Sequence, residues 1–291
     1  MTDRNAKELS VVVTGVSSGI GNGTARVLLA HGLRVFGSVR RPEDAKRLSA
    51  EFGGKFTPLI FDVTDENAVR RGAEQTRAAL GGNKLCGLVN NAGIAVPGPL
   101  LELPIAELRR QMEVNLISVL TVTQAFFPQL GRRSDGESDN ARIVNISSIA
   151  GKLALPFLGP YAAAKHGVEG LSDSLRRECM LYGIDVIVID PGSVATSIWD
   201  KADALDLSPY ARSPYIQSMT KLKDGMVSSG RKGSPPERVG ALVMRALTDR
   251  NPKARYVMGQ GNPMAWLSQR LPKRLLDRII AKNLGLLPAR S

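Results

Sequence analysis

The sequence predicts an α/β fold with a doubly wound, Rossmann-type parallel sheet of about seven strands, because short apolar runs alternate with helix-like segments along its 291 residues. The runs at residues 11–13 and 186–189 are apolar throughout, which is typical of parallel strands covered on both faces. A glycine-rich turn joins the first run to the first helix-like segment. Such strand–helix units form right-handed crossovers, so helices are expected on both faces of the sheet.

Seven apolar runs are expected to form the strands. They cover residues 9–14, 34–39, 56–61, 85–90, 142–146, 185–190 and 255–259. A helix-like segment follows each of the first six runs, and these segments cover about residues 19–31, 41–52, 66–80, 105–130, 161–182 and 236–249. This order is the alternation that a doubly wound sheet requires.

Two segments interrupt the alternation. Residues 132–140 are rich in Gly, Ser, Asp and Arg, which predicts an exposed loop. Residues 193–234 are longer than a plain connection, and a substrate lid beside the sheet edge is expected there. No repeat or low-complexity linker divides the chain. The sequence therefore predicts a single domain, with its core at residues 9–259 and an amphipathic helical extension at residues 263–291.

The composition is that of a soluble globular protein, although the formal net charge is +12. The basic residues are spread along the chain without interleaved aromatic residues, which argues against a nucleic-acid partner. The polar start resembles no signal peptide and no segment has the length of a membrane span, so a cytoplasmic protein is expected.

Cys86 and Cys179 are expected to be free, buried thiols. His31 and His166 lie far apart and have no ligand-type neighbours, so no metal site is predicted.

The glycine-rich turn predicts a dinucleotide site. Gly15, Gly19 and Gly21 lie where the first strand ends and the first helix begins. Glycine lacks a Cβ and a helix N-terminus offers free N–H groups, so a pyrophosphate can approach the backbone closely. The spacing differs from the generic G-x-G-x-x-G fingerprint, and the strand–turn–helix context therefore carries the prediction.

A second motif predicts proton transfer. Tyr161 and Lys165 are four residues apart in a helix-like segment, so their side chains share one face. A free tyrosine, with a pKa of about 10, is a poor base at neutral pH. The Lys165 ammonium is expected to lower the pKa of Tyr161 into the working range. Ser148, with Ser147 as the neighbouring alternative, can donate a hydrogen bond to a substrate oxygen that gains negative charge.

These motifs occur together and in order, and the chain resembles the short-chain dehydrogenase/reductase family from residue 9 to about residue 259. The resemblance rests on Thr-Gly-x-x-x-Gly-Ile-Gly at residues 14–21, Asp62-Val63, Asn90-Asn91-Ala92-Gly93, Asn115, Ser148, Tyr161-x-x-x-Lys165 and Pro191-Gly192. It implies an NAD(P)-dependent oxidoreductase that interconverts a carbonyl and an alcohol. The catalytic residues that it implies are Asn115, Ser148, Tyr161 and Lys165.

The resemblance also implies a cofactor site. Its positions in this sequence are Gly15, Ser17, Ser18, Gly19, Ile20, Gly21, Arg40, Asp62, Val63, Asn91, Ala92, Gly93, Tyr161, Lys165, Pro191, Gly192, Val194 and Thr196. In similar enzymes the residue matching Asp62 bonds the adenine amino group. The residue matching Asn115 distorts its helix, and the freed backbone holds a water that links Lys165 to solvent. Asn90 and Asn91 are used by the family both for the cofactor and for the strand end, and both uses stay open here.

The end of the second strand indicates which dinucleotide binds. In the family's NAD enzymes an acid at this position accepts a hydrogen bond from the ribose 2′-hydroxyl. Val39 occupies that position here and Arg40 follows it. Because a guanidinium can bind a 2′-phosphate, NADP(H) is favoured, with NAD(H) as the alternative.

The segments expected to face the substrate are apolar, which predicts a small hydrophobic carbonyl or alcohol of steroid, retinoid or lipid type. Arg40 and the C-terminal extension resemble the branch that contains 17β-hydroxysteroid and retinol dehydrogenases. A 3-oxoacyl or polyketide ketoreductase is the rival enzyme, because the lid holds basic residues that suit a pantetheine-carried substrate, namely Lys221, Lys223, Arg231 and Lys232. A cofactor-binding regulatory protein is the rival of another class, and it predicts an incomplete Tyr–Lys–Ser set.

The C-terminal extension has one apolar face with basic residues beside it. The apolar positions are Leu275, Leu276, Ile279 and Ile280, and the basic ones are Arg274, Arg278 and Lys282. Packing on its own domain is favoured, with peripheral contact to an anionic membrane or to another subunit as the alternatives. By resemblance, the helices that contain Asn115 and Tyr161 form the interface of a homodimer or homotetramer.

Overall fold

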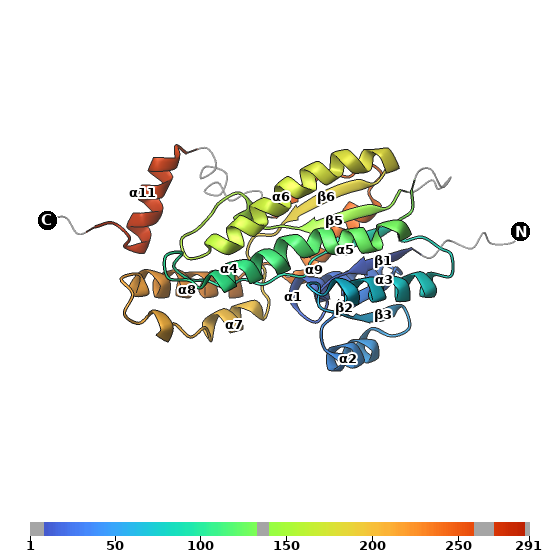
Figure 1. Ribbon diagram of the computed structural model, residues 1–291, viewed down its shortest axis with the longest axis horizontal. Coiled ribbons are helices and arrows are strands. Elements are labelled where there is room, and N and C mark those ends of the chain that lie inside the picture. The colour runs from blue at the N-terminus through green and yellow to red at the C-terminus, as the bar shows by residue number, and fades with distance from the viewer. Residues whose placement is uncertain (1–8, 133–139, 259–270, 289–291) are drawn as a thin grey trace, which may run out of the picture.

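Seven parallel strands form one sheet in the order β3-β2-β1-β4-β5-β6-β7. Figure 1 shows the computed structural model, which describes residues 9–132, 140–258 and 271–288. The strands are β1 (Ser10–Val13), β2 (Arg34–Val39), β3 (Phe56–Ile60), β4 (Gly87–Asn90), β5 (Arg142–Ile146), β6 (Asp185–Asp190) and β7 (Arg255–Val257). The predicted doubly wound sheet is therefore confirmed. In its centre, Val11 lies opposite Val35 of β2 and Gly87 of β4.

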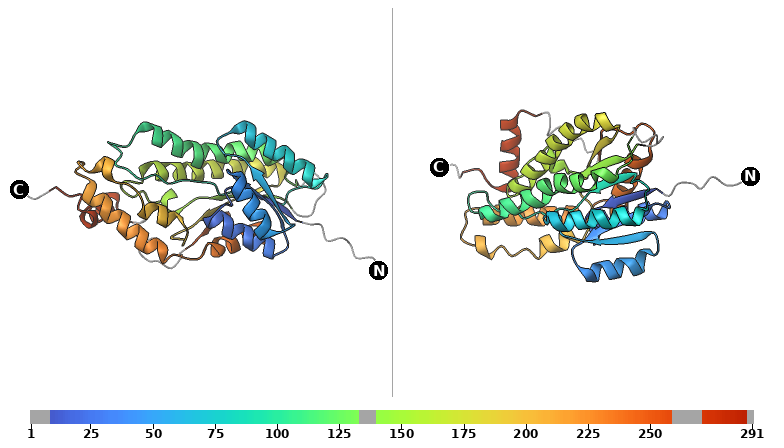
Figure 2. Two further views of the ribbon diagram at one scale, coloured as in Figure 1. Left: turned by 90° about the horizontal axis from the view of Figure 1, so that it is seen from below. Right: turned by 45° about the vertical axis from the view of Figure 1, so that its right-hand side comes forward.

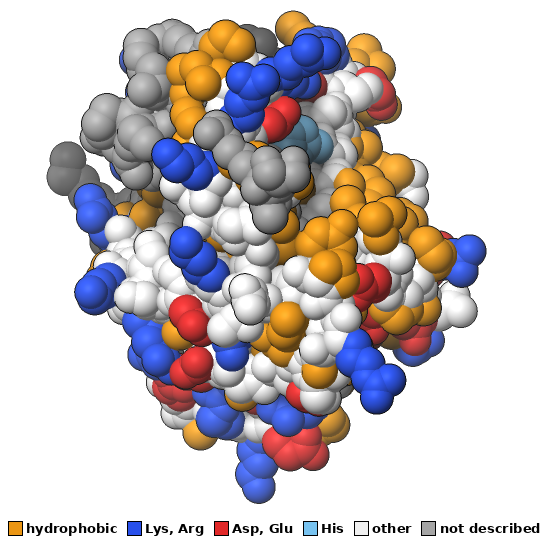
Figure 3. Space-filling view, turned by 90° about the vertical axis from the view of Figure 1, so that its left-hand side faces the viewer, with side chains coloured by type: hydrophobic (Ala, Val, Ile, Leu, Met, Phe, Trp, Pro, Cys, Tyr) orange, Lys and Arg blue, Asp and Glu red, His pale blue; other side chains and the backbone are white. Residues whose placement is uncertain are grey.

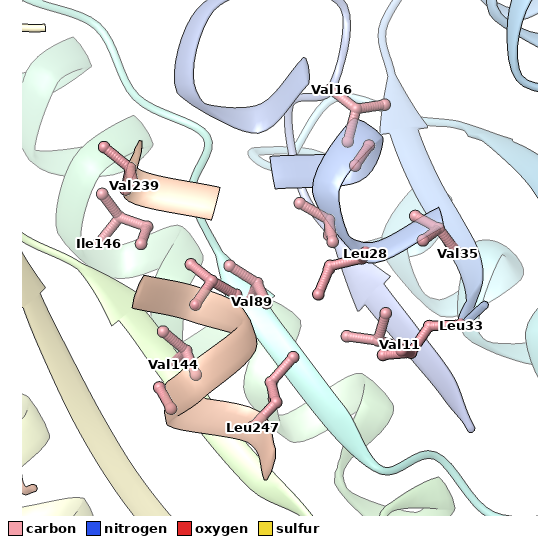
Figure 4. Packing of buried hydrophobic residues seen from close by; sticks show 14 of the residues in the cluster. Val11, Val16, Leu28, Leu33, Val35, Val89, Val144, Ile146, Val239 and Leu247 are labelled. Carbon is pink, nitrogen blue, oxygen red and sulfur yellow. The ribbon is translucent and has the colours of Figure 1, made fainter. Parts of the chain in front are cut away.

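Helices cover both faces because neighbouring side chains of each strand point to opposite sides. Val11 and Val13 pack in one buried cluster with α1 (Gly19–Ala30), α2 (Pro42–Phe52) and α9 (Pro236–Thr248). Figure 4 shows this cluster from close by. Val12 packs in the other cluster with α3 (Glu66–Leu80), α5 (Ser118–Phe126) and α6 (Gly159–Cys179).

The topology fixes where a site can form. Chain order reverses between β1 and β4, so the loops after these strands diverge at the carboxyl edge of the sheet. In open α/β sheets, ligands bind at this switch point. The residues that follow β1, β4, β5 and β6 are therefore brought to one edge.

The helix predicted at residues 105–130 is present, but it is not α-helical throughout. It divides into α4 (Ile105–Met112), a π-helical turn (Glu113–Ile117), α5 and a short 3₁₀ turn (Phe127–Gln129). The π turn contains the buried Asn115. Such turns are often found at functional sites, and the helix distortion that the resemblance implied at Asn115 is present.

The segment predicted as a lid contains two helices, α7 (Ile198–Asp203) and α8 (Ile216–Arg231), that the sequence pattern did not indicate. Its two ends meet, because Ala195 N donates to Ser234 O at 2.9 Å and Ser234 N donates to Ser193 O at 3.0 Å. The segment therefore leaves and rejoins the sheet edge at one point. Figure 2 shows α7 and α8 at the end of the molecule away from the N-terminus.

The C-terminal extension forms α11 (Lys273–Leu284), which lies against α8. Residues 263–270 of the predicted extension and residues 133–139 of the predicted loop lie outside the described residues. Leu275 and Ile279 are exposed, and Figure 3 shows hydrophobic side chains interspersed with Lys and Arg at this end of the molecule. Within the described ranges, no helix combines the length and the apolarity needed to span a bilayer.

Helices α1 and α9 cross at glycine, and this crossing gives a first prediction. A Cβ on Gly23 would lie 2.6 Å from the Pro236 Cβ and 2.8 Å from the Pro236 carbonyl carbon. We expect Gly23→Ala to lower the free energy of unfolding by about 1–3 kcal/mol, measured by urea denaturation. The control is Gly225→Ala in α8, where an added Cβ meets no atom within 4 Å. Equal stability of the two variants would contradict the tight crossing.

Candidate active site

The glycine-rich turn is built so that no side chain covers it. Gly15 and Gly19 have φ angles of 72° and 59°, a region that favours glycine. A Cβ on Gly21 would lie 2.2 Å from the Gly15 carbonyl oxygen and 2.5 Å from Asn91 Nδ2. The Ser18 side chain does not cap α1, which leaves the first N–H groups of the helix for an anion.

Side chains of β1 and β4 tie this turn to the sheet. The Thr14 hydroxyl accepts from the backbone N–H groups of Asn91 at 2.9 Å and Ala92 at 3.0 Å. Asn91 Nδ2 donates back to Thr14 O at 2.8 Å. Asn90 Nδ2 donates to Asn145 Oδ1 at 2.9 Å. Both asparagines therefore stabilise the strand ends, which is one of the two uses that the sequence left open.

The end of β2 presents a cation. Val39 is 2% exposed and packs in the core, whereas Arg40 is exposed and forms no ion pair within the described part of the chain. The next residue, Arg41, is held by Asp44 at 3.0 Å. Ser38 supports the glycine turn, since its hydroxyl accepts from Gly15 N at 3.0 Å. Arg40 is thus the charge at this edge that remains available to a phosphate.

The third strand ends in a fixed carboxylate. Asp62 Oδ1 accepts from Thr64 N at 3.0 Å and from the Thr64 hydroxyl at 2.8 Å. Asp62 is half-buried, while Val63 beside it is buried. The other Asp62 oxygen and the Val63 backbone lie at the carboxyl edge, where an adenine would bind by resemblance.

Two amides on one helical face hold the loop after β4. Asn115 accepts from Ile94 N and donates to Ile94 O, both at 2.8 Å. Gln111, one turn earlier, does the same for Val96, with both bonds at 3.0 Å. Gly93 in the same loop lies close to Asn115, since a Cβ on Gly93 would lie 3.1 Å from Asn115 Oδ1. Gln111 was missed from the sequence, although its spacing of four residues from Asn115 was visible.

Tyr161, Ser148 and Lys165 converge. The Tyr161 and Ser148 side chains are half-buried and hydrogen-bonded to each other, whereas Lys165 is 5% exposed. Lys165 Nζ donates to the carbonyl of Ile146 at 2.8 Å and lies 5.8 Å from the centre of the Tyr161 ring. Ser148 also caps the short turn that follows β5, because its hydroxyl accepts from Ala150 N at 3.1 Å.

The pKa of Tyr161 moves in the direction opposite to the prediction. Burial raises the pKa of Tyr161, and only the hydrogen bond with Ser148 opposes the rise. Burial lowers the pKa of Lys165 to about 8, although the carboxylates of Asp190 and Glu169 counteract it. Desolvation of the phenolate therefore outweighs the hydrogen bond with Ser148. Tyr161 is therefore protonated at neutral pH and suited to donating a proton.

The base of the lid reaches the glycine turn. Ile149 N donates to Pro191 O at 3.2 Å, which joins the Ser148 turn to the Pro191–Gly192 turn after β6. A Cβ on Gly19 would lie 3.4 Å from the Thr196 methyl carbon. Trp199 Nε1 donates to Val194 O at 2.6 Å. The residues predicted after β6 thus lie beside those predicted after β1.

A buried ionic cluster behind Lys165 was not predicted. Glu169 is one turn beyond Lys165 on α6, Asp190 ends β6, and both are bound by Arg255 of β7. Lys152 Nζ also lies 3.2 Å from Glu169 Oε2. The spacing of Tyr161, Lys165 and Glu169 at four-residue steps was the available signal.

The residues present fit a dinucleotide. The glycine turn leaves the room that a Cβ would fill, and the first N–H groups of α1 are not capped by a side chain. Arg40 at the end of β2 forms no ion pair with any described residue.

The predicted free thiols are confirmed as well, since Cys86 and Cys179 are both unpaired, with Cys179 buried and Cys86 half-buried.

Known proteins resemble the chain in sequence and structure. The family model described as short chain dehydrogenase matches residues 10–205. An NADPH-dependent 3-dehydrocapnine reductase of Ornithobacterium rhinotracheale is 41% identical over 94% of this chain and 96% of its own length. Human 17-beta-hydroxysteroid dehydrogenase type 6 is 31% identical over 94% of this chain and 88% of its own. A short-chain dehydrogenase from Streptomyces avermitilis superposes with a TM-score of 0.73 at 26% identity, covering 96% and 97% of the two chains.

Proposed function

This chain belongs to the short chain dehydrogenase family, and on that premise we propose that it uses NADPH to reduce a ketone or aldehyde on a hydrophobic molecule. The observation that carries the proposal is the convergence of Tyr161, Ser148 and Lys165 at the sheet edge that also bears the glycine turn. Because burial keeps Tyr161 protonated, the site suits proton donation, which reduction requires. The relative named as an NADPH-dependent reductase supports both the cofactor and the direction.

Bound NADPH supplies the hydride. The Ser148 hydroxyl donates a hydrogen bond to the substrate oxygen, where negative charge grows during reduction. Tyr161 then donates its phenolic proton to that oxygen. The Lys165 ammonium, fixed by the Ile146 carbonyl, stabilises the negative charge left on the phenol oxygen. Asn115 positions the loop after β4 through both backbone groups of Ile94.

The residues proposed to hold the dinucleotide come from every loop at the carboxyl edge. They are Gly15, Ser17, Ser18, Gly19, Ile20, Gly21, Arg40, Asp62, Val63, Asn91, Ala92, Gly93, Tyr161, Lys165, Pro191, Gly192, Val194 and Thr196. The glycine turn and the start of α1 would bind the pyrophosphate, and Arg40 the 2′-phosphate. Lys165 and Thr196 would lie at the nicotinamide end.

The substrate side supports an apolar ligand. Phe157 lies between Ser148 and Tyr161 in the chain and has a φ of 65°, a conformation unusual for a residue with a side chain. Its ring lies 5.8 Å from that of Tyr215, edge to face. Its carbonyl accepts from Gly98 N at 2.8 Å, which joins the loops after β4 and β5. Aromatic residues at the meeting point of these two loops would favour a hydrophobic substrate.

Two of the basic lid residues that suit a pantetheine-carried substrate are engaged within the lid. Arg231 pairs with Asp203 at 2.8 Å and with Asp200 at 3.3 Å. Lys223 donates to the Asp203 carbonyl at 3.3 Å. The regulatory alternative is disfavoured too, because the Tyr–Lys–Ser set is complete and assembled.

The function is tested by following NADPH oxidation with candidate carbonyl compounds. The panel comprises 3-dehydrocapnine, ketosteroids, retinals and 3-oxoacyl thioesters, each measured in parallel with NADH. We expect turnover with an apolar ketone or aldehyde and a preference for NADPH. Turnover confined to the thioesters would favour the ketoreductase alternative, and NADPH binding without turnover of any class would favour the regulatory one.

Arg40 gives a prediction for cofactor choice. A guanidinium–phosphate contact is worth about 1.5–3 kcal/mol, so Arg40→Ser should weaken NADPH binding about 10–100-fold. NADH binding should stay within about twofold, because NADH has no 2′-phosphate. The measurement is titration of each cofactor by protein fluorescence. The matched control is Arg41→Ser, since Arg41 is already paired with Asp44. An equal loss for both cofactors would remove Arg40 from this role.

A further inference from the structure

Two buried carboxyl groups share one guanidinium behind the proposed catalytic lysine. Glu169 of α6 is 5% exposed and Asp190 of β6 is 2% exposed. Arg255 Nη1 donates to Asp190 Oδ2 at 2.6 Å, and Arg255 Nη2 donates to Glu169 Oε2. Figure 1 shows α6 running along β6, and Arg255 comes from β7, the edge strand next to β6.

The hydrogen bonds leave one oxygen of each carboxyl without a donor. These atoms are Glu169 Oε1 and Asp190 Oδ1, which are buried and have no partner within the described residues when both groups are ionised. A buried oxygen without a donor costs free energy, and two adjacent carboxylates repel each other. A proton on Asp190 removes both problems, because that carboxyl then donates a hydrogen bond to Glu169.

The electrostatics of the pair agree with a shared proton. Burial, together with the hydrogen bond and charge of Glu169, raises the pKa of Asp190 to about 7, although Arg255 opposes the rise. Burial would also raise the pKa of Glu169, but hydrogen bonds with Arg255, Ser147 and Asp190 outweigh it and hold the pKa below its usual range. Two carboxyls that share a site separate their titrations in this way.

The pair lies next to the anchor of Lys165. Lys165 Nζ is bound to Ile146 O at 2.8 Å, and Ile146 lies opposite Ile189, the residue before Asp190. Glu169 is one helical turn from Lys165. The charged groups around the pair are Lys165 and Glu169 of α6, Asp190 of β6, Arg255 of β7, and Lys152, which lies 3.2 Å from Glu169. Both carboxyls act on the Lys165 ammonium.

We propose that Glu169 and Asp190, bridged by Arg255, hold one proton between them and act as positioning residues for the Lys165 ammonium. The pair carries one negative charge up to neutral pH and two above it, which keeps Lys165 charged as the pH rises. This inference rests on the proposed function of Lys165. When the pair loses its shared proton, it gains a second negative charge. This happens in the pH range where burial favours the loss of a proton from Lys165, and the added charge opposes that loss. The site would thereby keep its working charge over a wider pH range.

The shared proton is tested in the unmodified protein. Isotope-labelled Asp and Glu carboxyl carbons are followed by NMR from acidic to alkaline pH. We expect one carboxyl to titrate about three pH units above the ordinary Asp value of about 4. Asp190→Asn should abolish that titration. A wild-type spectrum in which every carboxyl titrates below pH of about 6 would overturn the proposal, whether or not any variant folds.

The effect on Lys165 is tested by the pH dependence of kcat. In Glu169→Gln, Asp190 no longer has a carboxyl partner, so the site holds one negative charge at alkaline pH instead of two. We expect the alkaline limb of kcat to move down by about one pH unit, since a charge at this range shifts a pKa by about 1–3 units. The matched control is Asp173→Asn, one turn further along α6, where the carboxylate pairs with Arg176. An unmoved limb in a Glu169→Gln enzyme that binds NADPH normally would refute the positioning role.

The shared proton and the proposed reaction are tested by separate measurements. The NMR titration does not depend on turnover, so it tests the shared proton whether or not the proposed reaction takes place. If the carboxyl titrates near neutrality but Tyr161 proves dispensable for turnover, the proposed function is wrong and the shared proton remains. If no carboxyl titrates there, the pair has no such role even in an active reductase.

Discussion

A Tyr161→Phe enzyme should bind NADPH as tightly as the wild type and lose nearly all turnover. Phenylalanine keeps the ring in the space beside Lys165 and removes only the proton that the substrate oxygen needs. General acid catalysis contributes about 10²–10⁴-fold, and kcat should fall by at least that factor. The measurements are single-turnover oxidation of NADPH and, separately, its dissociation constant.

Tyr215→Phe is the matched control for Tyr161→Phe. Tyr215 lies against the Phe157 ring and also loses only a hydroxyl in this change. It should keep most of its turnover, because stacking does not need the oxygen. If Tyr161→Phe retained turnover comparable to this control, Tyr161 would not be the proton donor.

The sheet could be predicted because parallel strands buried on both faces are apolar at every position. Residues 186–189 show no alternation and lie in β6, which is buried along most of its length. The glycine turn could be predicted for a related reason. At Gly15 the backbone conformation excludes other residues, and at Gly21 crowding does. The glycines themselves therefore indicate the turn in the sequence.

Features set by contacts between distant segments could not be predicted. The π-helical turn at Asn115 depends on two hydrogen bonds to Ile94, twenty-one residues away. The lid helix α7 is only six residues long, and α8 carries two glycines. Packing between them holds both in place, since a Cβ on Gly230 would overlap the Trp199 ring. Their periodicity was therefore too weak to indicate helix.

The direction of the Tyr161 pKa shift shows the same limit. Spacing of four residues correctly placed Tyr161 and Lys165 on one face, which made a lowered tyrosine pKa the natural expectation. The outcome depends on how far burial desolvates the phenol, and sequence spacing carries no information about that. Arg255 reaches Glu169 from eighty-six positions away, so the cluster that bears on Lys165 was equally hidden.

Lys165→Met should remove both the turnover and its alkaline dependence. Burial lowers the pKa of Lys165 to about 8, so the ammonium form predominates below that pH and is lost above it. The kcat of the wild type for reduction should therefore be constant below a pH of about 8 and fall about tenfold per pH unit above it. Methionine matches the length of the side chain without the charge. We expect kcat to drop by about 10²–10⁴-fold at neutral pH, and the residual rate to show no break near pH 8.

The control for Lys165→Met is Lys152→Met, which removes the other lysine of the same cluster. Lys152 has a side chain 41% exposed and pairs with Glu169, so its charge is screened by water and reaches the phenol only through that carboxylate. This variant should keep its turnover and a break in the pH profile close to that of the wild type. Should Lys165→Met retain the break near pH 8, the titrating group would be a group other than Lys165. The ammonium would then position the phenol without setting the pH range, because a methionine cannot take up or release a proton.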